Sequence, residues 1–140
     1  MEEIRQSPEQ ILRQIEKEEQ SLNRGRLKIF FGYAAGVGKT YAMLKAAHAA
    51  KSRGIDVIAG YIEPHARPQT SALMNGLECL QNLVTEYNGI ILSEFHLDAA
   101  LVRHPQLILV DELAHTNASV CRHTKRYQDI QELLNAGIDV

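Results

Sequence analysis

Short apolar runs and longer stretches of mixed polarity alternate along this chain. Three runs are almost continuously apolar, which is typical of parallel strands buried on both faces, and they cover residues 27–31, 56–61 and 107–111. Helices are predicted over residues 39–53, 97–103 and 124–136, with a shorter one over 69–76. Strands that alternate with helices predict an α/β fold, a three-layer sandwich around a mostly parallel sheet.

A small β-hairpin is predicted beside this sheet. Asn88-Gly89 separates two short runs, Leu83–Tyr87 and Ile90–Ser93, and this dipeptide is the strongest short signal for a two-residue hairpin turn. The last three residues, Ile138–Val140, follow Gly137 and look like the first residues of another strand.

A separate helix is predicted near the N-terminus. Ser7 is a favourable N-cap, Pro8 suits the first helical position, and Gln10 completes a capping box. Asn23-Arg24-Gly25 can end this helix. Its apolar stripe, which includes Ile11, is thin, so the helix docks either on its own domain or on a partner helix. Docking on its own domain is the simpler expectation.

Composition places the chain among ordinary soluble proteins. Its 140 residues are 45% apolar and 23% charged, enough for one domain with a real core. We therefore expect an N-terminal helix over residues 1–25 and one domain over residues 26–140. The net charge of −2 gives no electrostatic reason to expect binding to nucleic acid or to a membrane surface.

Cysteine and histidine usage points to a cytoplasmic protein without a structural metal. Cys79, Cys121 and the six histidines show no metal-ligand spacing, so both cysteines are interpreted as reduced thiols. No stretch approaches the ~18 consecutive apolar residues of a membrane span.

Candidate chemistry is concentrated just after the first apolar run. There the sequence Gly36-Val37-Gly38-Lys39-Thr40 forms a Gly-rich turn that opens a helix, and such turns bind phosphate through backbone N–H groups and the helix dipole. In a phosphate loop the lysine reaches the β- and γ-phosphates and the Thr hydroxyl ligates Mg²⁺. Tyr33 stands where the usual pattern has its first glycine. The residues expected to contact ATP here are Ala34, Ala35, Gly36, Val37, Gly38, Lys39, Thr40 and Tyr41.

A second motif supplies carboxylates. Asp111 and Glu112 end the apolar strand that begins at Leu107. We expect Asp111 to hold Mg²⁺ together with Thr40, through a water molecule, because Mg²⁺ keeps much of its hydration shell. Glu112 is the candidate general base for hydrolysis. Its alternative role is a structural ion pair with a nearby lysine or arginine.

Further polar residues follow the same strand ends. Because parallel strands present their carboxyl ends at one edge of a sheet, the loops after the three apolar runs can share one site. Glu63 and Arg67 form either a γ-phosphate sensor or a local ion pair. Asn117 is expected to hydrogen-bond the γ-phosphate, and His115 is a candidate loop cap.

A basic cluster follows this loop, at Arg122, Lys125 and Arg126. It either reaches phosphate, in its own or a neighbouring subunit, or lies solvated at the start of a helix. The solvated alternative is favoured.

The order of strands in the sheet has a consequence for the C-terminal residues. Folds with two adjacent acids on this strand often insert a later strand between it and the phosphate-loop strand. A strand that begins at Ile138 would take that position. Because an incomplete central strand leaves backbone groups unpaired, we expect the chain either to pair with another copy or to place the two strands side by side.

These motifs resemble the N-terminal cytoplasmic domain of the KdpD family, the potassium- and turgor-responsive sensor histidine kinases. The resemblance covers nearly the whole chain. The sequence Val-Asp-Glu-Leu-Ala-His-Thr-Asn over residues 110–117 is highly specific to that family. The other main matching stretches are Gly36–Leu44, Gly60–Glu63 and Ala136–Val140. The chain departs from the family pattern at Tyr33, Ala35 and Tyr127, where the family has a small residue, a proline and a tryptophan.

The resemblance implies a P-loop NTPase-like fold that binds ATP and Mg²⁺ and adjusts kinase and phosphatase output toward a response regulator. The implied partners are a stress-protein-like domain, transmembrane helices and a kinase core, in a membrane protein that keeps this domain on its cytoplasmic side. Relative to that family the chain is truncated at its C-terminus. Since it lacks the kinase core, at most weak ATPase activity is expected of it.

Four functions stay open from the residues themselves. The leading one is a regulatory module that senses Mg²⁺–ATP. The others are a slow ATPase with Glu112 as base, a small-molecule phosphotransferase with Glu63–Arg67 at its acceptor site, and a scaffold whose phosphate loop is disabled by Tyr33. A homodimer is possible in each case.

Overall fold

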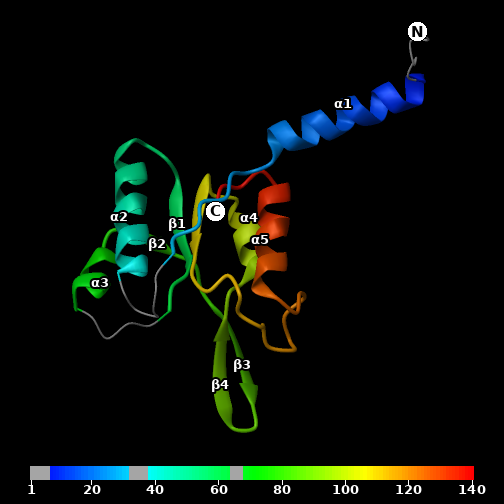
Figure 1. Cartoon of the computed structure of the whole chain (residues 1–140). Coiled ribbons are helices and arrows are strands. Elements are labelled where there is room, and N and C mark those ends of the chain that lie inside the picture. Colours follow the sequence, from blue (N-terminus) through cyan, green and yellow to red (C-terminus); the bar gives the residue numbers. More distant parts are fainter. Residues whose placement is uncertain (1–6, 32–37, 64–67) are drawn as a thin grey trace.

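The computed structural model describes residues 7–31, 38–63 and 68–140 (Figure 1). In chain order its helices and strands are α1 Pro8–Asn23, α2 Lys39–Ser52, β1 Val57–Tyr61, α3 Pro68–Leu73, β2 Glu78–Cys79, β3 Leu83–Tyr87, β4 Ile90–Glu94, α4 Leu97–Arg103, β5 Leu107–Val110 and α5 Arg126–Asn135. The helices predicted at residues 39–53, 97–103 and 124–136 are confirmed as α2, α4 and α5. The two-residue strand β2 is not predicted by the sequence pattern.

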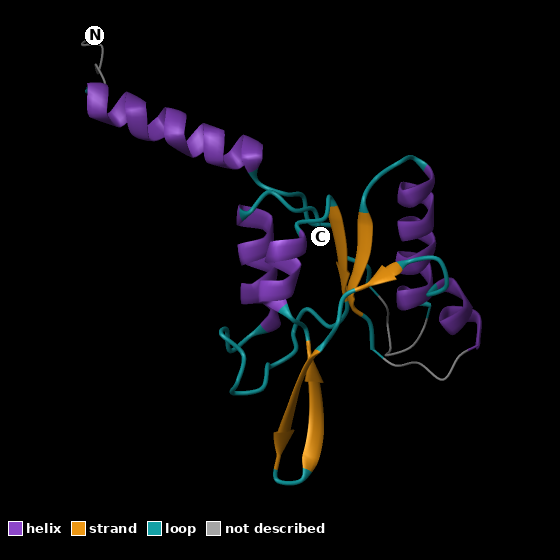
Figure 2. Ribbon diagram, turned by 180° about the vertical axis from the view of Figure 1, so that it is seen from behind, coloured by secondary structure: helices purple, strands orange, loops and turns teal. Residues whose placement is uncertain are grey.

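The central sheet is small and parallel, with the strand order β2-β1-β5. Ile58 of β1 lies opposite Ile108 of β5 on one edge and opposite Glu78 of β2 on the other. Helices α2 and α3 cover one face of this sheet, and α4 and α5 cover the other (Figures 1 and 2). The prediction of an α/β fold with a parallel sheet and a separate hairpin is therefore confirmed.

Alternate side chains of the strands build two separate cores, one on each face. Ile58 and Ile108, both fully buried, pack with Leu133 of α5 on one face. Their neighbours Val57 and Leu109 pack with Leu44 of α2 on the other. Because successive side chains of a strand point to opposite faces, both faces need apolar residues, and this explains the continuous apolar runs.

The run at residues 27–31, expected to be the first core strand, is not a strand in the structure. Among the described residues its backbone hydrogen bonds lie at its beginning, where the Lys28 N–H donates to the Val140 carbonyl at 2.9 Å and the Val140 N–H donates to the Arg26 carbonyl at 3.0 Å. A β-bridge also joins Leu107 of β5 to Asp139. Residues 138–140 thus lie between β5 and the segment that begins at Arg26, in the position predicted for a strand starting at Ile138.

Gly25 allows this close approach. A Cβ atom at that position would lie 1.9 Å from the carbonyl oxygen of Ile138, closer than any real side chain comes. The Gly25 N–H also donates to the Leu134 carbonyl at the end of α5, at 2.8 Å. The backbone therefore needs a glycine where the N-terminal segment meets the C-terminal one.

The predicted hairpin is confirmed as β3 and β4. Asn88 and Gly89 both have positive φ, 51° and 77°, as a two-residue turn of this type requires. The hairpin projects away from the rest of the molecule (Figure 2). Several of its apolar side chains are exposed, among them Val84, Tyr87, Ile90 and Ile91.

Helix α1 has the predicted capping box. The Gln10 N–H donates to the Ser7 hydroxyl at 3.2 Å, and the Ser7 N–H donates to the Gln10 side chain at 3.0 Å. The expectation that this helix docks on its own domain is wrong for this structure, because it extends away from the body (Figure 1). Ile11, Leu12 and Ile15 are 45%, 57% and 47% exposed. The stripe is too narrow to hold the helix against the domain.

Both cysteines are free thiols, and burial raises the pKa of Cys121. No helix in the described part of the chain is long and apolar enough to cross a membrane.

A charged clamp joins α4 to two strands. Arg103, near the end of α4, donates to both carboxylate oxygens of Asp56 at 2.7 Å and to those of Glu78 at 2.7 and 3.1 Å. Hydrogen bonding to this guanidinium lowers the pKa of both carboxyl groups, and the two carboxylates in turn raise the pKa of Arg103. Two adjacent strands and the helix over them are therefore linked through one side chain.

Replacing Arg103 with Gln should make stability less dependent on pH. Carboxyl groups whose pKa is lowered in the folded state stabilise it above their unfolded pKa of about 4, and this contribution disappears as the pH falls through the lowered values. The wild type should therefore exceed Arg103→Gln in stability at pH 7, and the difference should shrink below about pH 4. Urea unfolding across this range measures it, with Arg13→Gln on the exposed helix α1 as control. An equal gap at both ends of the range would contradict the clamp.

Candidate functional site

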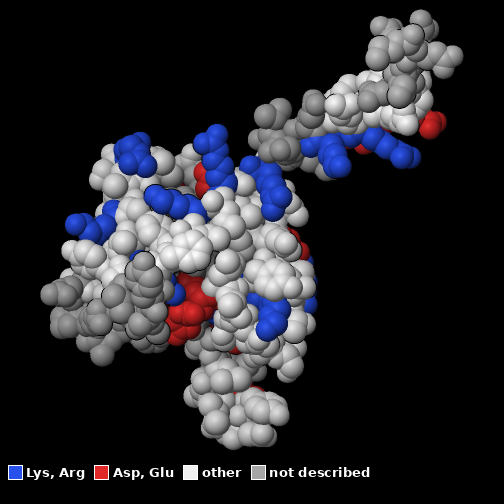
Figure 3. All heavy atoms as spheres, in the orientation of Figure 1, with Lys and Arg blue, Asp and Glu red and all other residues white. Residues whose placement is uncertain are grey.

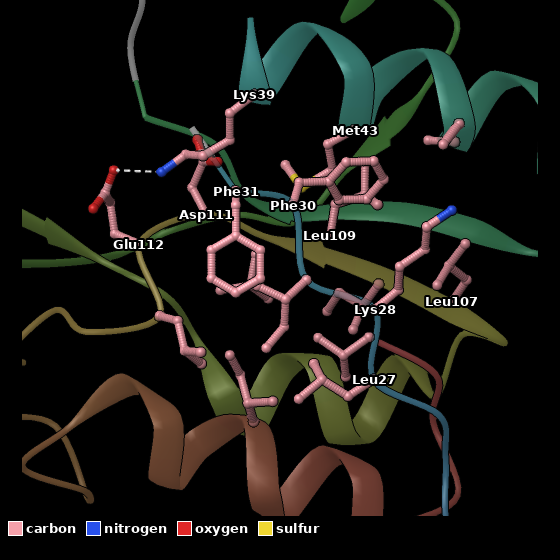
Figure 4. Close-up of a pocket in the computed structure, with 18 of the residues that line it drawn as sticks. Leu27, Lys28, Phe30, Phe31, Lys39, Met43, Leu107, Leu109, Asp111 and Glu112 are labelled. Atoms are coloured by element: carbon pink, nitrogen blue, oxygen red, sulfur yellow. Dashed lines mark hydrogen bonds and ion pairs between the residues drawn. The ribbon is translucent and has the colours of Figure 1, made fainter. Parts of the chain in front are cut away.

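The predicted site residues come together where the carboxyl ends of β1 and β5 meet the start of α2. Lys39 and Thr40 are the first two residues of α2, Glu63 follows β1, and Asp111 and Glu112 follow β5. Lys39, Asp111 and Glu112 all line the same cavity (Figure 4). The edge of the sheet expected to carry the site is therefore the edge where these side chains gather.

The start of α2 has the backbone conformation of a tight turn. Gly38, the N-cap, has a φ of 71°, in the left-handed region that favours glycine, and no side chain caps the helix there. Thr40 is 7% exposed, whereas Tyr41 is on the exposed side of the helix. The predicted contacts at Ala34, Ala35, Gly36 and Val37 lie outside the described residues, as does Tyr33.

An ion pair crosses the site from α2 to the segment after β5. Lys39 Nζ lies 3.3 Å from Glu112 Oε1, and the two side chains are 26% and 47% exposed. Figure 4 shows the two side chains pointing toward one another. Because both remain in contact with solvent, the pair contributes little to stability and its partners can exchange.

Asp111 is held far more firmly. It is 3% exposed, and its Oδ2 accepts the Glu63 N–H at 2.8 Å. Its own N–H donates to the Tyr61 carbonyl at 2.8 Å, and its carbonyl accepts from Arg126 Nη1 at 2.9 Å. Contacts from the end of β1 and from α5 therefore hold Asp111 in place.

Glu112 has an unusual backbone. Its φ of 50° lies in the left-handed region, which costs a non-glycine residue about 1–2 kcal/mol. This conformation turns the chain sharply after β5, so that Asp111 stays buried while the next side chain reaches Lys39. Such strain is more common at functional sites than elsewhere.

The buried cation Arg126 holds the segment directly after β5 in place. Arg126 is completely buried; its Nη2 lies 3.2 Å from Oε2 of Glu94, and its guanidinium lies 4.3 Å from the centre of the Tyr61 ring. His115 Nε2 lies 3.0 Å from both oxygens of the same carboxylate. Burial, followed by the nearby Glu63 carboxylate, raises the pKa of Tyr61. The N–H of Ala118 donates to the same carboxylate at 3.1 Å, so one carboxylate at the base of the hairpin binds three groups from the segment that follows β5.

The side chain of Asn117 makes a second set of buried hydrogen bonds. Its amide nitrogen donates to the His123 carbonyl at 3.0 Å and to Asp129 Oδ2 at 2.9 Å, and burial raises the pKa of Asp129. The buried Asn117 Oδ1 is one of two buried side-chain atoms without a hydrogen-bond partner among the described residues, the other being Arg126 Nε. Whether Asn117 reaches a γ-phosphate stays a prediction; here its amide group holds the loop to α5.

The expected basic cluster is not a cluster. Arg126 points into the protein, Arg122 pairs with Asp98 and Glu132, and the Lys125 ammonium group donates to the Thr116 hydroxyl. On the face shown in Figure 3, lysine and arginine side chains are scattered over the body and along α1, and acidic side chains gather in one hollow. Arg67 lies outside the described residues, so its pairing with Glu63 stays a prediction.

The sequence pattern misses the support that Glu94 and Arg126 give to Asp111. They are 32 positions apart and only the fold brings them together. The one local signal is that Glu94 directly precedes the apolar Phe95 at the end of a hairpin strand. A charge in that position also fits an exposed strand end, so it does not identify a buried pair.

The chain is similar in sequence to known proteins of one family. Residues 23–140 match the family described as KdpD, the osmosensitive K⁺ channel His kinase sensor domain. The chain is 60% identical over 136 residues to the sensor protein KdpD of Clostridium acetobutylicum and 50% identical over 137 residues to that of Escherichia coli. These matches cover 97% and 98% of the chain but 15% of each relative. A putative sensor protein KdpD of Synechocystis is 48% identical over 117 residues, 84% of the chain and 32% of that relative.

Replacing Arg126 with Met should destabilise the fold strongly. The change leaves the Glu94 carboxylate buried without its guanidinium, and such losses typically cost about 3–5 kcal/mol in the free energy of unfolding. The double variant Glu94→Gln/Arg126→Met should recover part of this loss, because it removes the uncompensated charge. Urea unfolding followed by circular dichroism measures each value.

Arg122→Met is the matched control, since Arg122 pairs at the surface and its loss should cost less than about 1 kcal/mol. Equal costs for Arg122→Met and Arg126→Met would show that the buried pair does not support the end of β5.

Proposed function

The chain belongs to the KdpD family of osmosensitive K⁺ channel His kinase sensor domains, and on that basis we propose that it binds Mg²⁺–ATP as the regulatory nucleotide-sensing domain of a potassium-responsive sensor histidine kinase. The observation that carries the proposal is the position of Lys39 at the start of α2. Its ammonium group lies at a helix N-terminus and is paired across the site with Glu112, beside the oriented carboxylate of Asp111.

The donor set suits a magnesium–nucleotide complex. A hydroxyl at Thr40 and a carboxylate at Asp111 are hard oxygen ligands of the kind that Mg²⁺ prefers. The start of a helix favours negative charge, and the lysine beside it adds a cation for phosphate. Helices on both faces of a parallel sheet, with the polar residues at its carboxyl edge, support a P-loop NTPase-like arrangement.

The Lys39–Glu112 ion pair suggests how the site responds to phosphate. Lys39 would exchange the Glu112 carboxylate for phosphate oxygens, a move that the exposure of both side chains permits. Thr40 and Asp111 would hold Mg²⁺, which supplies charge neutralisation when bound. Release of Glu112 then changes the segment after β5, which also contacts the hairpin through His115 and Glu94. A nucleotide would in this way alter a surface beyond its own site.

Slow hydrolysis is the second candidate function. The Glu112 carboxylate lies at the site edge and, once released from Lys39, would be able to accept a proton from water. The remaining alternatives from the sequence, a phosphotransferase and a scaffold with a disabled phosphate loop, gain no specific support from the described residues.

The wider role rests on relatives much longer than this chain, which spans about 15% of the first two. We propose that the domain lies on the cytoplasmic side of a membrane-bound sensor kinase. There it would contact the rest of the kinase, including a stress-protein-like domain, and act indirectly on a response regulator. ATP occupancy would shift the balance between kinase and phosphatase output.

Calorimetric titration with Mg²⁺–ATP tests the site directly. Lys39→Ala should weaken binding by about 10- to 100-fold, the range expected when a charge-assisted hydrogen bond to phosphate is lost. Glu112→Gln should strengthen it by up to about fivefold, since it removes a competing carboxylate. Lys45→Ala is the control, because Lys45 lies further along the same helix, over the Tyr41 ring. No binding by a folded wild type would make the scaffold function the better one.

Phosphate release measures the second candidate. Steady release of phosphate from ATP that Glu112→Gln abolishes, while binding persists, would support a slow ATPase with this residue as base. Release at the same rate in wild type and Glu112→Gln would show that Glu112 is not the base and that its role is the ion pair with Lys39.

A further inference from the structure

The hairpin of β3 and β4 is a sheet of two strands with both of its outer edges unpaired. The strands pair with each other from Leu83 and Glu94 at the base to Tyr87 and Ile90 at the turn. Among the described residues, no backbone hydrogen bond joins residues 83–94 to another element. Because a two-stranded hairpin alone is only marginally stable in water, this one requires stabilisation from elsewhere.

Part of that stabilisation comes from the base of the hairpin. Glu94, the last residue of β4, is 5% exposed and binds Arg126, His115 and the N–H of Ala118. From this anchored end the two strands project away from the body (Figure 2). The outer half of the hairpin is therefore presented in a fixed direction, which lowers the entropic cost of binding through it.

The projecting part is apolar on both faces. Tyr87 and Ile90 lie opposite each other on one face, and Val84 and Ile91 lie on the other. All four side chains are exposed, Ile90 by 62% and Ile91 by 72%. Four large apolar side chains gathered on one short hairpin form a patch, and such patches mark interaction surfaces.

The backbone of β4 offers hydrogen bonds along its outer edge. The turn at Asn88-Gly89 joins Tyr87 and Ile90, whose backbone groups face each other across it. Because the bonding direction alternates along a strand, the N–H and carbonyl groups of Ile91 and Ser93 point away from β3. An edge of this kind can pair with a further strand.

The two edges of the hairpin differ in charge. By the same alternation, the backbone of Glu86 in the middle of β3 faces the outer edge of that strand, and its charge protects the edge against pairing. Two β3 edges that pair around their middle would place two such carboxylates close together. Residues 90–93 of β4 carry no charge. The edge that is open to another strand is therefore that of β4.

We propose that β4 is a dimerisation edge, which pairs antiparallel with β4 of a second copy around a twofold axis. The result is a four-stranded sheet in the order β3-β4-β4-β3. In the register that matches apolar residues throughout, Ile91 lies opposite Ile91 of the second copy, and Ile90 lies opposite Leu92 of the second copy. This inference goes beyond nucleotide binding and does not depend on it.

The size of the patch fits a second copy that binds reversibly. Exposed apolar patches of monomers typically measure about 300–600 Å², so two of them bury about 600–1,200 Å² in a twofold dimer. This is the low end of specific interfaces, and a dissociation constant on the order of 100 μM is expected. The twofold arrangement satisfies both β4 edges at once and leaves only the charged β3 edges outside, so assembly stops at two.

Sedimentation of the chain without nucleotide, from about 10 μM to 1 mM, tests the dimer. Ile91→Lys should raise the dissociation constant at least about tenfold, because it places two ammonium groups directly opposite each other in the interface. Val102→Lys is the matched control. Val102 is 87% exposed but belongs to α4, so its replacement should leave the dimer unchanged.

A cross-link covers the case of a lysine that disturbs the hairpin itself. In a chain with Cys79→Ser and Cys121→Ser, Ile91→Cys should form a disulfide between two copies on mild oxidation. Directly opposite residues of a hydrogen-bonded pair have Cα atoms about 5.5 Å apart, a distance that a disulfide spans. Val102→Cys in the same chain should cross-link at least about tenfold more slowly, because α4 lies outside the interface.

Three results would overturn the proposal. Monomers at every concentration, without the cross-link at position 91, would leave the patch to another polypeptide. A dimer that Ile91→Lys does not weaken would place the interface elsewhere, and open-ended oligomers would show that both edges of the hairpin pair. Since nucleotide is absent throughout, failure of ATP binding leaves each of these results unaffected.

Discussion

A parallel strand inside a sheet has to be covered on both faces and paired on both edges, and this constraint organises the whole molecule. Coverage explains the two cores: Ile58 and Ile108 require α4 and α5, and Val57 and Leu109 require α2. Pairing explains why β5 sits between β1 and Asp139. The polar residues then gather at the carboxyl edge, because only there do the strands leave the apolar layers. The candidate site is a consequence of how this sheet is buried.

The end of β5 shows how a charged site is kept rigid at the border of an apolar core. Asp111 is buried, yet its carboxylate, N–H and carbonyl each have a protein partner, one of which is Arg126. Arg126 is itself buried, and its charge is balanced by Glu94. Burying this pair costs desolvation energy, so its value lies less in net stability than in fixing one arrangement of β5, α5 and the hairpin. By contrast, the Lys39–Glu112 pair is partly solvated and can rearrange, as a ligand-exchanging site requires.

What the sequence predicts correctly is largely local or strongly periodic. The capping box at Ser7 and Gln10 and the turn at Asn88-Gly89 depend on residues a few positions apart, and both form as expected. The prediction of a strand at residues 27–31 is wrong, and the backbone bonds at its beginning go to Val140, a partner far away in the sequence that a local pattern does not reveal. The preference for a solvated Arg126 is wrong for the same reason, since its partner Glu94 is distant in sequence. Lys39, Asp111 and Glu112 lie together as predicted because strand order places their loops at one edge.

The two sides of the candidate site depend on one feature of the sheet. Lys39 belongs to α2, which follows the segment of residues 27–31, whereas Asp111 and Glu112 belong to the end of β5. The separation of these two supports is set by what lies between them in the sheet, and among the described residues this is the segment 138–140. The backbone pairing of that segment with both of its neighbours therefore helps to set the distance between the cation and the carboxylates on which the proposed nucleotide site depends.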